Sequence, residues 1–85
     1  MSINYVKADG NYIEIHTDKK KYVIRYKIGE FLGMVPDPLE YLRISRSYII
    51  RLDKVQEKSK KDVTVAGEKI TVGETYLDEL EKIKF

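Results

Sequence analysis

Short runs of alternating apolar and polar residues, each closed by turn-forming residues, constrain the fold of this chain more than any other feature. In the run YIEIHT at 12–17, isoleucines alternate with more polar side chains, which is the pattern of a half-buried strand. Asp9-Gly10 supplies residue types that accept a positive φ, and residues 18–20 indicate a second turn. Residues 3–26 are therefore predicted to form three antiparallel strands connected as a meander.

Two segments have helical rather than strand periodicity. Between residues 27 and 35 the apolar side chains recur at i, i+3, i+4 and i+7, which predicts a short helix. Pro-Asp-Pro at 36–38 should end it, because proline lacks the backbone donor and restricts the residue before it. Residues 74–85 also place their apolar side chains on one helical face, with Thr75 and Asp78 as a capping pair.

The remaining segments have β-prone composition. Residues 41–56 are strand-like but interrupted near 45–47, and residues 63–72 form two β-branched runs around Ala66-Gly67, the pattern of a hairpin. The lysine-rich stretch 56–62 is predicted to be a polar loop. The sequence therefore predicts a mostly β fold with about seven short strands, one short internal helix and one C-terminal helix.

Length and composition exclude several classes of protein. The chain has 85 residues, which suits one small domain, and no cysteine, which excludes disulfides and thiolate metal sites and suits a reducing cytoplasm. It has no apolar run of membrane-spanning length and no N-terminal signal peptide pattern. We therefore expect a single cytoplasmic domain over residues 1–85, with no membrane association.

Catalytic, metal and cofactor chemistry have little support in the sequence. His16 shares a predicted strand face with Glu14, but two ligands do not make a metal site. The serines at 45 and 47 lack the glycine-flanked elbow of a hydrolase, and there is no glycine-rich phosphate loop. No catalytic residue, metal ligand or cofactor is predicted, and the chain is not expected to be an enzyme.

The positive charges gather in the first part of the chain. Residues 1–61 hold 13 Lys and Arg against 8 Asp and Glu, whereas residues 62–85 hold 3 against 6. A basic region of this kind is consistent with nucleic acid or an acidic protein partner, but on charge alone an ordinary solvated surface of mixed charge explains it better.

The stretch LRISRSYIIRL at 42–52 combines arginines with a β-prone apolar run. In one straight strand Arg46 would point to the same side as the apolar residues, and burying it without a partner would be costly. The chain is therefore predicted to turn or bulge at 45–47, although Arg46 could instead pair with an acidic residue at a sheet edge. Lysine, arginine and serine suit phosphate contacts, and arginine and asparagine suit base edges.

Four segments of the chain resemble the LytTR-type DNA-binding domain, the output module of many bacterial response regulators. They are INYVKADGNYIEIHT at 3–17, the helix and Arg-Ser-Tyr-Ile-Ile signature within 27–55, DVTVAGEKITV at 62–72 and GETYLDEL at 73–80. The resemblance implies an elongated, mostly β antiparallel fold whose loops enter successive major grooves of double-stranded DNA. It also implies an upstream receiver domain, and that the chain lacks a leading strand or hairpin that complete members carry.

The resemblance implies three contact regions, at Asn11, at Ser45 and Arg46, and at Glu74 and Thr75. The hypothesis is sequence-specific binding by a transcriptional regulator, with two copies on repeated sites. Asn11 and Arg46 would approach bases, while Arg43 would either contact DNA or brace the loop from inside. The expected backbone contacts are Ser45, Ser47, Arg51, Lys58, Lys60 and Lys61.

The chain departs from the family pattern at each of these regions but the first. Ser45 replaces the usual histidine of the signature, and Arg51 replaces an asparagine. Gly73-Glu74 replaces Ser-Arg, and a carboxylate there repels phosphate although it can accept from cytosine N4. Glu74 therefore leaves an alternative open, a protein-interaction module on the same fold with weak or no DNA binding.

Overall fold

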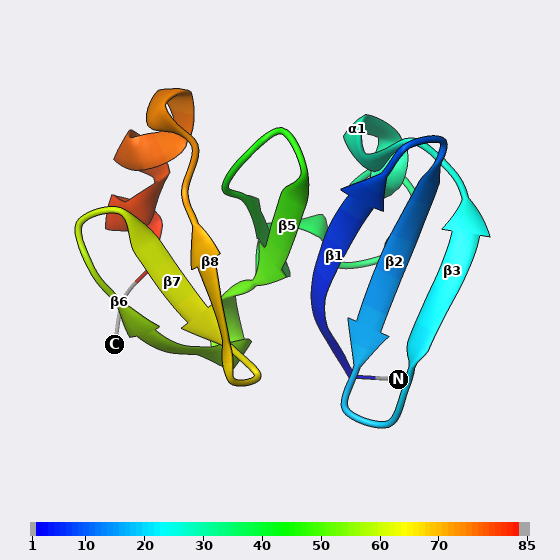
Figure 1. Ribbon diagram of the computed structural model, residues 1–85, viewed down its shortest axis with the longest axis horizontal. Coiled ribbons are helices and arrows are strands. Elements are labelled where there is room, and N and C mark those ends of the chain that lie inside the picture. The colour runs from blue at the N-terminus through cyan, green and yellow to red at the C-terminus, as the bar shows by residue number, and fades with distance from the viewer. Residues whose placement is uncertain (1, 84–85) are drawn as a thin grey trace.

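Two antiparallel sheets lie side by side in the structure, a computed structural model that describes residues 2–83 (Figure 1). The first has five strands in the order β3-β2-β1-β5-β4 and the second three in the order β6-β7-β8. The principal extents are 32 × 26 × 22 Å. The strands are β1 (Ile3–Asp9), β2 (Tyr12–Thr17), β3 (Lys21–Arg25), β4 (Tyr41–Arg43), β5 (Tyr48–Arg51), β6 (Val55–Lys58), β7 (Asp62–Val65) and β8 (Glu68–Thr71).

The predicted N-terminal meander is confirmed as β1, β2 and β3. Asp9 pairs with Tyr12, so only Gly10 and Asn11 remain in the turn between the first two strands. Gly10 has a φ of +62°, which glycine adopts without strain. The short turn therefore holds Asn11 at the tip of a hairpin that belongs to the larger sheet.

The predicted internal helix is shorter than the sequence suggested. α1 spans Ile28–Phe31, and the chain then continues in turns closed by i→i+3 hydrogen bonds, such as the 3.1 Å bond from the Gly33 N–H to the Glu30 carbonyl. Glycine at position 33 weakens helix propagation, so the apolar spacing is realised in only one helical turn. Two further short 3₁₀ helices are η1 (Pro38–Glu40) and η2 (Leu52–Lys54).

The C-terminal helix, η3 (Glu74–Lys82), is a 3₁₀ helix, and residues 84–85 of the predicted segment lie outside the described residues. The predicted capping pair of Thr75 and Asp78 was wrong. Gly73 is the N-cap, and no side chain caps the helix start. The first turn begins two residues earlier than the capping pattern suggested, so Thr75 already lies within the helix.

The predicted loop at 56–62 was also partly wrong. Residues 55–58 form β6, which pairs with β7, and the turn is confined to Ser59–Lys61. The Ser59 hydroxyl donates to the Asp62 carboxylate at 2.8 Å and closes this turn. β6 is an edge strand whose residues are mostly exposed, so it lacks the apolar alternation that marks strands in sequence.

The five-stranded sheet buries one face against α1, and the other face only where β1, β4 and β5 meet the second sheet; Val23 of β3 is 54% exposed on that second face. Val6, Ile13 and Ile49 pack against α1 on one face, where Phe31 is fully buried. On the other face, Tyr5 and Ile50 pack against the second sheet and η3 through a cluster completed by Leu42, Ile44, Val63, Val65, Ile70, Val72, Leu80 and Ile83. Consecutive residues of one strand therefore pack into different hydrophobic clusters. A shift of the strand pairing by one residue would exchange them, so this arrangement fixes the register.

The β7–β8 hairpin offers a test of the turn geometry. Ala66 has a φ of +52°, which an alanine adopts at a cost, whereas asparagine tolerates it. Ala66→Asn should raise the free energy of unfolding in urea by about 1 kcal/mol. As a control, Gly67→Ala should lower it, because it places a Cβ at a φ of +81°. A loss of stability in Ala66→Asn would contradict this account of the turn.

Candidate nucleic-acid interface

Loops from distant parts of the sequence meet at the upper edge of the molecule in Figure 1. The Ala8 N–H donates to the Ser47 carbonyl at 2.8 Å, which joins β1 to the β4–β5 loop. The Gly73 N–H donates to the Ile44 carbonyl at 2.8 Å and joins that loop to the start of η3. We call this row the loop edge; it consists of Gly10–Asn11, Ser45–Ser47 and Gly73–Thr75.

The β4–β5 loop is held from inside by Arg43. Its Nε donates to the Ser45 carbonyl at 3.0 Å and its Nη2 to the Arg46 carbonyl at 2.8 Å. The loop therefore turns at 45–47, as predicted, and the Arg46 side chain is exposed. Arg46 makes no ion pair within residues 2–83, so the alternative of an acidic partner at a sheet edge is not observed.

The start of η3 approaches this loop closely at Gly73. A Cβ at position 73 would lie 3.2 Å from Tyr76 Cδ2 and 3.5 Å from the Ser45 Cα. The distance to Ser45 is an ordinary van der Waals contact, and the tighter one lies within η3, so a small side chain at position 73 would require only a slight shift of the Tyr76 ring. Glu74 and Thr75 follow it directly and are exposed beside Ser45.

Asn11 and the lysines at 60 and 61 are also exposed. Asn11 occupies the β1–β2 turn and makes no side-chain hydrogen bond within the described chain. Lys60 and Lys61 lie in the β6–β7 turn, and the Val72 N–H donates to the Lys61 carbonyl at 2.7 Å. The lysine turn therefore adjoins the loop edge through the last residue before Gly73.

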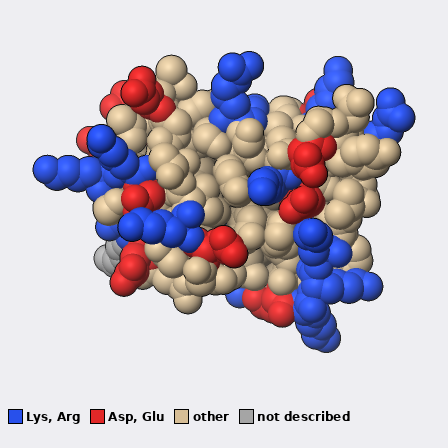
Figure 2. Space-filling model, viewed as in Figure 1, with Lys and Arg blue, Asp and Glu red and all other residues tan. Residues whose placement is uncertain are grey.

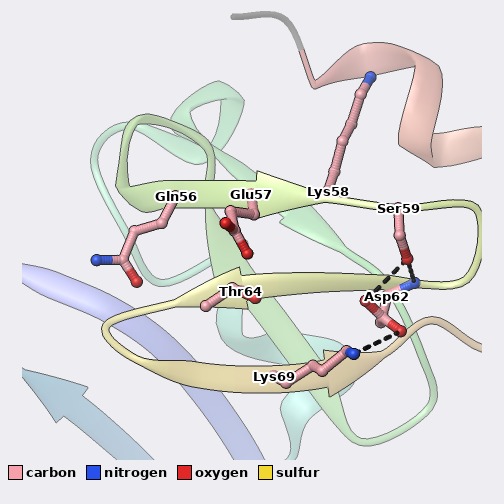
Figure 3. A pocket seen from close by; sticks show the side chains of 7 residues that line it. All are labelled: Gln56, Glu57, Lys58, Ser59, Asp62, Thr64 and Lys69. Atoms are coloured by element: carbon pink, nitrogen blue, oxygen red, sulfur yellow. Dashed lines mark hydrogen bonds and ion pairs between the residues drawn. The ribbon is translucent and has the colours of Figure 1, made fainter.

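Two of the predicted contact residues are engaged elsewhere. Arg51 lies at the end of β5 away from the loop edge, with its Nε 2.9 Å from the Asp53 carboxylate and its guanidinium over the Tyr41 ring. The Lys58 ammonium donates to the Leu80 and Ile83 carbonyls at 3.1 and 2.7 Å. Figure 3 shows the Lys58 side chain rising from β6 toward η3. Both residues stabilise the fold, and their contact with DNA stays a prediction.

A shallow hollow of about 430 Å³ on the second sheet offers no separate site (Figure 3). Three of its polar groups pair with one another, since Asp62 accepts a hydrogen bond from Ser59 and lies 3.9 Å from the Lys69 ammonium. On the first sheet, His16 stacks on Tyr5 and lies 3.0 Å from the Glu14 carboxylate, and this hydrogen bond lowers the pKa of Glu14. Residues 2–83 contain no cluster of three potential metal ligands.

The charge pattern differs along the upper edge. Figure 2 shows basic side chains at its centre and right and acidic side chains at its left end. The exposed arginine of the β4–β5 loop and the exposed carboxylate of Glu74 thus belong to adjoining segments, which the hydrogen bond from the Gly73 N–H to the Ile44 carbonyl joins. The edge can approach a polyanion at its centre and meets it less favourably at η3.

Comparison with known proteins identifies a matching family model and a similar solved structure. The family model described as the LytTr DNA-binding domain matches residues 1–84. A LytTr DNA-binding domain from a protein described as a methyl-accepting/DNA response regulator of Bacillus cereus has a similar structure. Its TM-score is 0.81 at 17% sequence identity, over 96% of this chain and 80% of that chain. A comparison with curated proteins finds no match. No helix within residues 2–83 has the length and hydropathy to cross a membrane.

Substitution of Arg43 and of Arg46 should have different effects on the free energy of unfolding, because only Arg43 hydrogen-bonds to the β4–β5 loop. Arg43→Ala removes both hydrogen bonds to the loop carbonyls and should lower the free energy of unfolding by about 1–2 kcal/mol. Arg46→Ala, the matched control, should change it by less than about 0.5 kcal/mol, because its side chain is exposed. Urea unfolding measures both values, and equal losses would remove the bracing role from Arg43.

Proposed function

The chain belongs to the LytTr DNA-binding domain family, and on that premise we propose that it binds specific double-stranded DNA sequences as the output domain of a bacterial transcriptional regulator. The observation that carries the proposal is the loop edge. It gathers Asn11, Arg46 and Thr75 from three distant segments on one side of the molecule. A rigid row of short polar loops suits insertion into the grooves of a duplex.

Arg46 and Asn11 are the proposed base readers. Arginine recognises guanine through a bidentate bond to O6 and N7, and asparagine recognises adenine through N6 and N7. Both side chains are exposed and free of ion pairs within the described chain, so reading a base would displace only water. Their loops are short and hydrogen-bonded, which lowers the entropy lost on binding.

The remaining predicted residues would contact the DNA backbone, and the structure supports some of these contacts better than others. Ser47, Lys60 and Lys61 are exposed, whereas Ser45 is half-buried and its hydroxyl already accepts from the Ser47 N–H at 3.2 Å. Arg51 and Lys58 have partners in the fold, so their proposed contacts rest on sequence position alone. The contacts with the phosphates of the DNA backbone should therefore come mainly from the loop edge and from the turn that holds Lys60 and Lys61.

One domain of this size offers a modest interface, since single DNA-binding modules bury roughly 600–1,000 Å² of protein surface. We therefore propose that two copies bind neighbouring repeats in the bacterial cytoplasm. A receiver domain upstream in the same polypeptide would control their activity.

The alternative is a protein-interaction module, and Glu74 is the observation that favours it. This carboxylate is exposed at the loop edge, where phosphate would be repelled. The salt dependence of binding distinguishes the two functions, because DNA binding weakens steeply with salt through counterion release.

The first test selects binders from a random-sequence duplex pool at low salt and then measures affinity for the selected sites across a salt series. Arg46→Ala should weaken specific binding by about 1–3 kcal/mol, as expected for a lost bidentate base contact. Lys19→Ala removes a positive charge from the exposed β2–β3 turn and serves as the matched control. Absence of any retention of wild-type protein at low salt would overturn the proposed function.

The second test concerns the carboxylate at η3. Glu74→Arg should tighten binding to unselected duplex and steepen the salt dependence by about one counterion, because it replaces a repulsive group with a phosphate ligand. Glu81→Arg makes the same charge change on an exposed residue near the far end of η3 and should have a smaller effect. Looser binding in Glu74→Arg would show instead that the native carboxylate makes a favourable contact.

A further inference from the structure

We propose that Arg25 and Lys27 form an additional binding site for a phosphate of the DNA backbone, beside the β1–β2 turn. The proposal rests on the proposed DNA-binding function and extends the loop edge past Asn11. A hollow of about 450 Å³ lies there. It is lined by Gly10, Asn11, Arg25, Tyr26, Lys27 and Glu30.

Strand pairing and the approach of α1 create this hollow. The antiparallel register of β2 and β3 places Arg25 opposite Tyr12, the residue that follows Asn11. Lys27 is the N-cap residue of α1, two positions further along the chain. The end of β3 therefore brings two basic residues to the turn that carries a proposed base reader.

The two basic residues are exposed and uncommitted within residues 2–83. Neither takes part in an ion pair, whereas Arg51, Lys54 and Lys69 each face a carboxylate. The one acidic residue in the lining, Glu30, lies beyond ion-pair distance of both cations. The hollow thus keeps an excess of positive charge that the fold itself does not use.

Its place beside Asn11 indicates a backbone phosphate rather than a base. The major groove is about 12 Å wide, so a loop that enters it is bordered on both sides by phosphates. Basic residues on the flank of such a loop meet those phosphates, while the tip of the loop meets the base edges. An arginine can hold a phosphate through two parallel N–H···O bonds, and a nearby lysine adds a second charge.

The test compares the salt dependence of binding of the 85-residue chain and its variants on the selected duplex. Arg25→Ala/Lys27→Ala should make the negative slope of log affinity against log salt shallower by about 2, close to 0.9 for each lost contact, and leave the base preference unchanged. Lys19→Ala/Lys20→Ala makes the same charge change in the β2–β3 turn at the other end of β3 and should leave the slope nearly unchanged. Thermal unfolding establishes that each variant is folded. If Arg25→Ala/Lys27→Ala does not fold, Arg25→Gln/Lys27→Gln removes the same two charges and takes its place.

The outcomes separate this site from the function on which it rests. If the slope of log affinity against log salt is the same for the wild-type protein and for Arg25→Ala/Lys27→Ala, the proposed phosphate site is wrong and the DNA-binding function is unaffected. Failure of the wild-type protein to bind would overturn the function first. Inorganic phosphate, titrated to millimolar concentration against backbone amide shifts, should cause no saturable change at Asn11 or Lys27. A saturable change would assign the hollow to a small free anion instead.

Discussion

The hydrogen bond from the Gly73 N–H to the Ile44 carbonyl is the contact on which the geometry of the loop edge depends. Ile44 is completely buried, and an added Cβ at position 73 would meet Ser45 at an ordinary contact distance of 3.5 Å. The bond is therefore anchored mainly by the closed core beneath it. Because it joins the end of the second sheet to the β4–β5 loop of the first, it sets how far η3 stands from Arg46.

The five-stranded sheet gives these loops a rigid base. Its strands bury one face against α1, and β1, β4 and β5 also bury the other against the second sheet, so the two-residue β1–β2 turn and the four-residue β4–β5 loop leave a packed support. Arg43 then ties the β4–β5 loop to its own strand by two hydrogen bonds. The side chains proposed to meet DNA are thus placed mainly by backbone contacts, which leaves the side chains themselves available to a ligand.

Sequence reasoning succeeded where the determinant is local. Alternation gave the meander, and the cost of burying Arg46 gave the turn at 45–47. It failed where neighbours in space decide: β6 is a strand because β7 pairs with it, although its residues are polar and exposed. The resemblance supplied Asn11 and Glu74 as candidates, while nothing local in the sequence pointed to Arg25 or Lys27.

The sequence by itself determined the N-terminal meander, the β7–β8 hairpin and the break in the strand at 45–47, because periodicity and backbone propensity act over a few residues. Tertiary structure alone decided which cations remain free. Lys58 is held by carbonyls 22 and 25 residues away, whereas Arg25 meets the turn of Asn11 only through the pairing of β2 with β3. Hydrogen bonds and ion pairs form between groups that folding brings together, so a count of charges along the chain cannot distinguish a structural lysine from one that a polyanion can reach.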